Sequence, residues 1–295
     1  MAKSRFETKK RADSGLLWLW PEYELALEFP PPAPYVVGIL NVTPDSFSDG
    51  GDFLTVENAL NRARAITGEG ATVIDVGGQS TRPGYSPVNL EEEKRRVIPV
   101  LKAIKEALPG YPLISIDTDK AELADEALGL GIADIINDTS GGDVAMAKVA
   151  ARRNAPLILT HRPAGMGRGS LSAVTRDLET IRERYIGAGL QRDYIAIDPG
   201  LGFGKDDGEN LALLSGCAGL LELGSPLHIG ASRKRFIGSV TGNDEPESRL
   251  GGSLAAAVWS ALAGASFTRV HDVRETVEAL AMIKALRECV TRECV

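Results

Sequence analysis

One pattern recurs along the chain and strongly limits its fold: a short apolar run stops at a polar or charged residue, and a segment with helical spacing follows. Eight such runs occur in the 295 residues. Their positions are 38–40, 73–76, 113–116, 135–136, 157–159, 195–197, 227–229 and 267–270. Alternating strand and helix patterns predict parallel strands, because parallel neighbours need a helical crossover and cannot be joined by a tight hairpin.

Eight strand and helix units in a chain of this length predict an α/β fold of the (β/α)8 TIM barrel type, which takes roughly 250 residues. The polar ends of the runs would then meet at the carboxyl-terminal face, where such barrels carry their active sites. A doubly wound open sheet is the alternative, and it also places ligands at strand ends. Helical spacing is found at 57–67, 91–108, 120–130, 173–190, 249–263 and 273–287.

The residues ahead of the first run predict a short N-terminal extension. Residues 1–15 are polar and mixed in charge, which favours a flexible N-terminus. Residues 16–34 contain two strand-like stretches and predict a hairpin at the barrel bottom. The apolar stretch Leu16–Trp20 is too short for a signal peptide or a membrane span. The barrel is expected over 35–288, followed by a tail at 289–295.

Composition narrows the class of partner. A net charge of −7 with only 5% aromatic residues and no long basic run argues against general binding to nucleic acid or to an anionic membrane. Any anionic ligand must therefore be held by local groups. Cys217, Cys289 and Cys294 lack zinc-type spacing, which favours free thiols and a cytoplasmic location.

Five loop motifs in register carry a family resemblance. NVTPDSFSDGG, GGQSTRPG, DPGLGFGK, GASRK and RVHDV together resemble the dihydropteroate synthases, in order and spacing, over residues 36–280. The resemblance implies a barrel enzyme of folate biosynthesis, a transferase. Such an enzyme joins 4-aminobenzoate to the methylene carbon of a dihydropterin diphosphate and releases diphosphate and 7,8-dihydropteroate.

Three polar residues at run ends suit a pterin. A dihydropterin has donors and acceptors along one edge, which carboxylate and amide groups can match. Asp117, Asn137 and Asp198 close different runs and would converge on the barrel axis. The alternative for each is that it caps the following helix. The resemblance implies that these three residues, together with Lys234, hold the pterin ring.

An arginine and a histidine on the last run suit the diphosphate. Arg269 and His271 are two residues apart on a predicted strand and so point to the same face. An arginine fork grips phosphate oxygens in a bidentate manner. An ordinary core histidine is the alternative for His271. The resemblance implies that the pair binds the leaving group and that Asn41 helps to bind Mg²⁺, the implied cofactor, which keeps waters and substrate phosphates as its other ligands.

The resemblance also implies two loops, 42–53 and 77–87, that close over the substrates. Glycines at the ends of each loop allow such movement. In the closed site Asp49 would stabilise the cation that forms on the pterin when the carbon–oxygen bond breaks. Thr81 and Arg82 of the second loop would contact the substrates.

The aminobenzoate site follows from the same resemblance. Phe47, Pro83 and Phe203 match the positions that sandwich the aminobenzoate ring. Ser232 lies in GASRK, ahead of a helical segment whose N-terminus favours a carboxylate. Arg235 stands where many members have serine, so a side-chain hydroxyl contact at that position is excluded. Lys234, Arg269, His271 and Asp49 are the expected catalytic residues.

Two other kinds of protein share the scaffold. Methyltetrahydrofolate-binding methyltransferases need neither an aminobenzoate loop nor a diphosphate site. A non-catalytic pterin-binding paralogue would be expected to lose loop residues such as Asp49 and Arg82, which are present here. Departures from the family pattern at Gln79 and Arg162 remove none of the expected site residues. The resemblance further implies a homodimer formed through the late helices.

A first prediction concerns the order of binding. If the loops complete the aminobenzoate pocket only over pterin, diphosphate and magnesium, then 4-aminobenzoate and sulfonamide mimics bind weakly to the free enzyme. The coupling must be reciprocal. Phe47→Ala should weaken aminobenzoate use with little effect on the first binding step. Titration of 4-aminobenzoate with and without pterin plus pyrophosphate measures the coupling, and equal affinities would show that the pocket is preformed.

Overall fold

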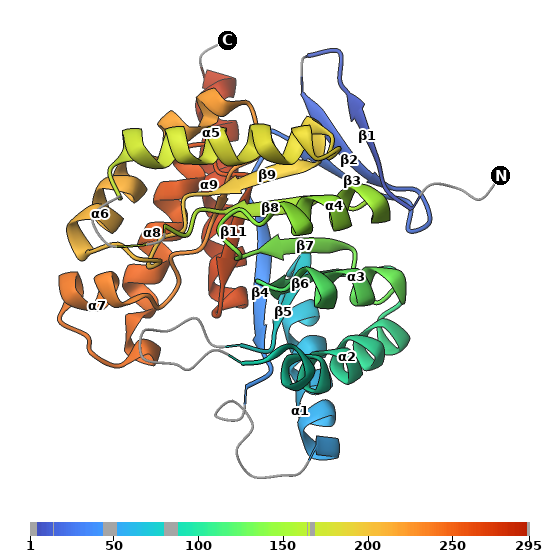
Figure 1. Ribbon diagram of the computed structural model, residues 1–295. Coiled ribbons are helices and arrows are strands. Elements are labelled where there is room, and N and C mark those ends of the chain that lie inside the picture. Colours follow the sequence, from blue (N-terminus) through green and yellow to red (C-terminus); the bar gives the residue numbers. More distant parts are fainter. Residues whose placement is uncertain are drawn as a thin grey trace.

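The molecule is a closed ring of parallel strands surrounded by helices (Figure 1). A computed structural model describes residues 5–13, 15–43, 52–79, 88–163, 165 and 169–293. The eight barrel strands are β4 Tyr35–Asn41, β5 Val73–Gly77, β6 Leu113–Thr118, β7 Ile135–Asp138, β8 Leu157–Thr160, β9 Ile195–Asp198, β10 His228–Ile229 and β11 Phe267–Val270.

Strand order confirms the predicted (β/α)8 barrel. The strands pair in parallel in the order β10-β11-β4-β5-β6-β7-β8-β9. A parallel bridge between Ile197 of β9 and Leu227, next to β10, joins the two ends of this order. Closure excludes the doubly wound open sheet, which would have two free edges.

Helices lie between the strands and cover the outside of the barrel. They are α1 Asp52–Gly68, α2 Leu90–Ala107, α3 Ala121–Gly129, α4 Val144–Arg153, α5 Leu171–Gly187, α6 Asp207–Ser215, α7 Arg235–Thr241, α8 Leu250–Leu262 and α9 Val273–Glu293. Short 3₁₀ segments occupy Arg192–Tyr194, Cys217–Leu223 and Pro246–Arg249. In the described part of the chain, no helix has the length and apolarity needed to cross a membrane.

Local sequence explains where several helices begin. The Asn89 side chain accepts a hydrogen bond from the Glu92 N–H, and Asp206 and Glu209 form a reciprocal capping box at the start of α6. The helical spacing of the sequence did not predict α4, α6 or α7. The seven residues of α7 make only about two turns, too few to show a clear period.

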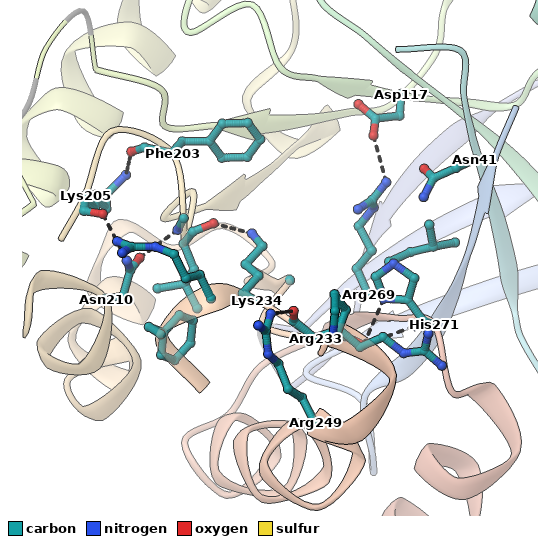
Figure 2. Close-up of a pocket in the computed structure, with 18 of the residues that line it drawn as sticks. Asn41, Asp117, Phe203, Lys205, Asn210, Arg233, Lys234, Arg249, Arg269 and His271 are labelled. Atoms are coloured by element: carbon teal, nitrogen blue, oxygen red, sulfur yellow. Dashed lines mark hydrogen bonds and ion pairs between the residues drawn. The ribbon is translucent and has the colours of Figure 1, made fainter. Parts of the chain in front are cut away.

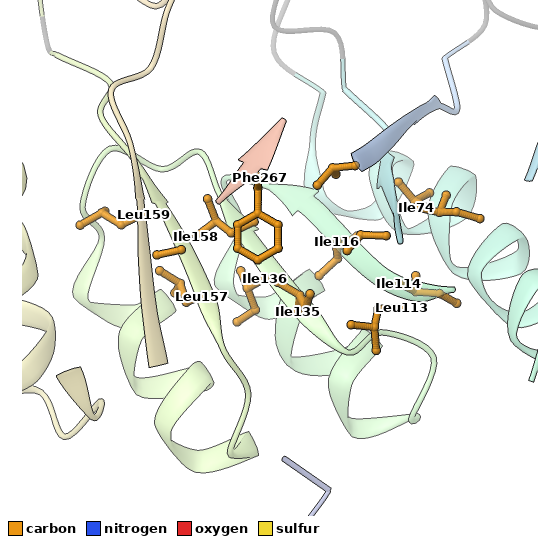
Figure 3. Close-up of a cluster of buried hydrophobic side chains, with 14 of the residues drawn as sticks. Ile74, Leu113, Ile114, Ile116, Ile135, Ile136, Leu157, Ile158, Leu159 and Phe267 are labelled. Atoms are coloured by element: carbon orange, nitrogen blue, oxygen red, sulfur yellow. The ribbon is translucent and has the colours of Figure 1, made fainter. Parts of the chain in front are cut away.

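Branched apolar side chains fill the space inside and around the strands (Figure 3). All five residues of β5 and all four of β8 are buried. Strands covered on both faces are expected to read as continuous apolar runs, which is the pattern that the sequence shows. Ile116, Ile136 and Ile158 lie in this packed core.

A small antiparallel sheet covers the amino-terminal end of the barrel. It consists of β1 Glu7–Lys10, β2 Leu16–Trp20 and β3 Leu25–Phe29. The Trp18 and Phe29 rings lie 5.9 and 5.4 Å from the ring of Phe267, the first residue of β11. The predicted hairpin of β2 and β3 is therefore confirmed. It lies at the amino-terminal end of the barrel, the barrel bottom, which is at the upper right in Figure 1.

The expectation that residues 1–15 are flexible is wrong for Glu7–Lys10, which form strand β1. Backbone pairing with β2 and the buried Phe6 side chain hold this segment in place. The Phe6 ring lies 5.8 Å from that of Trp18 and 4.8 Å from that of Tyr194. A polar strand of four residues has no apolar alternation, so its sequence pattern does not predict a strand.

A buried carboxylate fixes the small sheet to the barrel. Asp134 precedes β7 and is 3% exposed. Its oxygens accept hydrogen bonds from Arg5 at 3.2 Å, Tyr23 at 3.1 Å and Lys105 at 3.0 Å, and from the Ile114 backbone at 2.9 Å. Four donors compensate for the desolvation of this charge, which burial would otherwise make costly.

Candidate active site

A cavity of about 610 Å³ opens at the carboxyl ends of the strands (Figure 2). Its lining includes many of the residues that the sequence predicted for the site. They are Asn41, Asp117, Phe203, Ser232, Lys234, Arg269 and His271. Because every parallel strand ends at the same rim, closure of the barrel brings together residues that are more than 200 positions apart.

Arg269 joins two carboxylates in this cavity. Its Nε donates to Asp75 Oδ2 at 2.6 Å, and its Nη2 donates to Asp117 Oδ2 at 2.7 Å (Figure 2 draws the second contact). The Asp75 side chain is fully buried, and 13% of the Asp117 side chain is exposed. One cation therefore serves two acidic groups taken from neighbouring strands.

The surroundings of Asp117 raise its pKa. Burial raises the pKa of Asp117 to about 7, and the negative charges of Asp75 and Glu93 add to the rise, while Arg269 opposes it. Two carboxylates that share one counter-ion cannot both ionise without penalty. Asp117 therefore titrates near neutral pH.

Arg269 and His271 both line the cavity, as their spacing predicted, but they have different partners. The His271 Nδ1 lies 3.1 Å from Ser232 Oγ, and the His271 backbone N–H donates to the same oxygen at 3.2 Å. Ser232 thus orients the imidazole. The Arg269 guanidinium is held by Asp75 and Asp117, deeper in the barrel.

Asn137 and Asp198 are buried and do not line the cavity directly. The Asn137 Nδ2 donates to Asp75 Oδ2 at 3.0 Å, which links it to the Arg269 network. Asp198 accepts from His228 Nδ1 at 2.6 Å and from the Gly200 N–H at 2.6 Å. Neither residue caps a helix: α4 is capped by Asp143 and α6 by Asp206.

Lys234 lies close to Asp198 and to the loop that follows β9. Burial lowers the pKa of Lys234 to about 8, and the charge of Asp198 opposes this shift. Its Nζ donates to the Leu201 carbonyl oxygen and lies 5.3 Å from the centre of the Phe203 ring. The ammonium thus positions the aromatic face that lines the cavity (Figure 2).

A second lysine, Lys205, also holds the loop that follows β9. Lys205 is 4% exposed, and its Nζ donates to the carbonyl oxygens of Gly200 at 2.9 Å and Phe203 at 3.1 Å. Gly200 has φ of +66°, and a Cβ there would collide with the His161 carbonyl oxygen. Only glycine fits this position, so the loop conformation is strongly determined.

Asp75, His228 and Lys205 were not predicted from the sequence. Asp75 and His228 stand inside apolar runs, in VIDVG and LHI, where a buried polar residue needs a hydrogen-bonding partner. A charged or titratable residue within a buried strand was the signal that could have found both. Lys205 lay in a quoted motif, DPGLGFGK, and was given no role.

Five predicted site residues, Phe47, Asp49, Thr81, Arg82 and Pro83, lie outside the described residues. Among the residues that are described, no group of three or more His, Cys, Asp and Glu side chains could hold a metal ion. Asn41 offers a single amide oxygen at the cavity. That donor set fits a magnesium ion bound mainly through substrate phosphates and waters, and it does not fit a metal held by protein ligands alone.

Comparisons with known proteins identify the family of this chain. A family model described as "Pterin binding enzyme" matches residues 37–271. The dihydropteroate synthase of Escherichia coli K12 is 42% identical over 261 residues, which cover 85% of this chain and 91% of the relative.

Two solved structures are also similar. The dihydropteroate synthase from Clostridium difficile, in the presence of pteroic acid, has a TM-score of 0.82 and 41% identity, covering 86% of this chain and 97% of the other. The Xanthomonas albilineans dihydropteroate synthase with 4-aminobenzoic acid has a TM-score of 0.82 and 41% identity, with coverages of 86% and 93%.

The shared counter-ion makes a prediction about titration. Asp75→Asn removes one of the negative charges that raise the pKa of Asp117, so that pKa should fall from about 7 toward the ordinary range. Carboxyl ¹³C NMR measures the change. Asp138, whose burial raises its pKa to about 6, does not touch Asp75 and serves as the internal control. An unchanged Asp117 titration would mean that burial alone sets it.

Proposed function

This chain belongs to the family of pterin-binding enzymes, and we propose how its residues carry out the reaction of a dihydropteroate synthase. The enzyme is a transferase. It condenses (7,8-dihydropterin-6-yl)methyl diphosphate with 4-aminobenzoate to give 7,8-dihydropteroate and diphosphate in folate biosynthesis. The observation that carries this function is one cavity that gathers Asp117, Lys234, Arg269 and His271 within the matched region.

We assign the pterin to the deep end of the cavity. Asp117, Asn137 and Asp198 close β6, β7 and β9, and they offer acceptors for the ring N–H groups and an amide for the ring carbonyl. Lys234 adds a buried donor beside Asp198. Buried donors and acceptors that are left unmatched cost about 1–3 kcal/mol each, so this set selects a ligand with the complementary edge.

The diphosphate is assigned to Arg269 and His271. Arg269 uses its Nε–H and one Nη2–H on the two aspartates, which leaves three of its five N–H donors for phosphate oxygens. Asn41 would hold Mg²⁺ next to the diphosphate, and the metal would supply charge neutralisation of the leaving group. As the carbon–oxygen bond breaks, its electrons leave with the diphosphate and positive charge develops on the pterin.

The aminobenzoate is assigned to the outer part of the cavity. Phe203 provides a ring face, and Ser232 lies where the aminobenzoate carboxylate would bind. We retain Phe47 and Pro83 for the other side of the ring, Asp49 for stabilising the pterin cation, and Thr81 with Arg82 for substrate contacts, as the family resemblance implies. The amine then attacks the methylene carbon and loses a proton.

We also propose that the enzyme is a cytoplasmic homodimer. Four large apolar side chains are exposed on the outer helices: Trp259 at 51% and Leu262 at 55% on α8, and Met282 at 58% and Leu286 at 49% on α9. The two helices are neighbours, since Arg287 donates to the Ala261 carbonyl at 2.8 Å. An apolar surface on paired helices suits a self-complementary interface.

The assignment of Arg269 leads to a kinetic prediction. Arg269→Ala should lose about 2–4 kcal/mol of transition-state stabilisation, as expected for one preorganised charge-stabilising donor. Diphosphate release that depends on both substrates measures the loss. Arg192→Ala is the matched control, because Arg192 is half exposed, pairs with Glu183 and does not line the cavity. Near-normal activity of Arg269→Ala would refute the assigned role.

The dimer proposal is tested by sedimentation. The wild-type chain should sediment as a dimer at micromolar concentration, and Leu262→Glu should shift it to a monomer by placing a charge in the apolar surface. Leu130→Glu alters an equally exposed leucine next to α3 and should leave the dimer intact. A monomeric wild-type chain at that concentration would end the proposal.

A further inference from the structure

The buried histidine of β10 contacts an aspartate that we assign to the pterin. His228 has no exposed surface, and its Nδ1 lies 2.6 Å from Asp198 Oδ2. Its Nε2 is also buried and has no hydrogen-bond partner among the described residues. The ring otherwise contacts Phe267, with a distance of 6.2 Å between ring centres. The polar contacts of this imidazole are thus all directed to one carboxylate.

Asp198 is held on both oxygens. Oδ2 accepts from His228, and Oδ1 accepts from the Gly200 N–H at 2.6 Å. A carboxylate gripped on each oxygen cannot rotate, while each oxygen keeps a second lone pair for a ligand. The orientation of Asp198 is therefore fixed by protein donors.

Three buried aspartates at strand ends allow a comparison within one molecule. Burial raises the pKa of Asp117 to about 7 and that of Asp138 to about 6. Burial also favours a raised pKa at Asp198, but the hydrogen bond and charge interaction with His228, followed by Lys234 and the Gly200 N–H, bring it below the usual value. Among these three, only Asp198 has a histidine partner.

We propose that His228 is a positioning residue for substrate binding, whose Nδ1–H holds the Asp198 carboxylate in place, aimed at the pterin edge. It touches neither substrate nor the reacting atoms, and it acts only through Asp198. The inference rests on the proposed assignment of Asp198 to the pterin. An ionised carboxylate in a buried position binds ring N–H donors more strongly than a neutral carboxylic acid does.

Other charged and titratable groups also face Asp198. Four further groups interact with it electrostatically from the elements around it, namely Lys234, Lys205, Arg269 and His161. None of the four donates a hydrogen bond to its carboxylate, whereas His228 does. Removing His228 thus changes the hydrogen bonding of Asp198 and leaves the surrounding cations in place.

The test is the pH dependence of pterin affinity. Calorimetry with 6-hydroxymethylpterin, a ligand without diphosphate, is run on wild type and His228→Leu between pH 6 and pH 8.5. The ratio of the two affinities cancels the titrations that both proteins share, including those of the ligand and of Asp117. Without its donor, the pKa of Asp198 should rise, so the relative affinity of the variant should fall about tenfold between pH 8.5 and pH 6.

Two further variants sharpen the test. His228→Gln keeps an N–H donor and should hold the ratio within about threefold over the same range. Asp177→Asn is the matched control, because Asp177 is the partner of the other fully buried histidine, His161, at 3.3 Å and does not touch Asp198. Its ratio should not vary with pH. A ratio for His228→Leu that is independent of pH, or an equal trend in Asp177→Asn, would overturn the proposal.

Failure of the proposed function can be told apart from failure of this inference. If Asp198→Asn leaves pterin affinity unchanged, the pterin assignment is wrong. If Asp198→Asn weakens binding while His228→Leu shows a flat ratio, only the role of His228 is wrong.

A second measurement does not depend on the folding of His228→Leu. The chain has three histidines, so ¹⁵N-histidine NMR of the wild type is simple, and His228→Gln assigns the resonance. The His228 Nδ1 should show the ¹⁵N shift of a nitrogen that donates a hydrogen bond, and this resonance should move when 6-hydroxymethylpterin binds. A His228 resonance that ignores the pterin would also overturn the proposal.

Discussion

The ion pairs of Arg269 hold the catalytic end of the barrel together. The guanidinium extends from β11 to Asp75 on β5 and Asp117 on β6, and Asp75 also binds Asn137 on β7. Four strands are therefore joined at one level by a single charged network. Because the network carries two acids and one base, it leaves a buried excess of negative charge that a ligand with N–H donors can satisfy.

The two ends of the barrel have different roles: the amino-terminal end stabilises the fold, and the carboxyl-terminal end carries the candidate active site. At the amino-terminal end, the Trp18 and Phe267 rings pack together and Asp134 accepts hydrogen bonds from four donors. At the carboxyl-terminal end, Asp117, Lys234 and Arg269 line an open cavity. The tightly packed core stabilises the fold, so the carboxyl-terminal end can hold buried charged groups in fixed positions.

Polar residues at strand ends look alike in the sequence, and their surroundings separate them. Asp138 is the last residue of β7 and binds the Tyr185 hydroxyl at 2.5 Å and the Ser140 N–H at 2.9 Å, so it has a structural role. Asp117 and Asp198 lie at the ends of β6 and β9, on the same rim, and are tied to Arg269 and His228. The residue type is the same in all three, and the partner decides the function.

The sequence by itself determined the barrel, the hairpin below it and seven of the residues that line the cavity, because alternating apolar runs and loop motifs are local features that need no knowledge of closure. It could not determine which strand ends meet across the axis. Arg269 lies 152 positions from Asp117 and 194 from Asp75. The roles of Asp75 and His228 were decided only by the tertiary structure, because side chains that point into a closed barrel acquire their partners when the last strand pairs with the first.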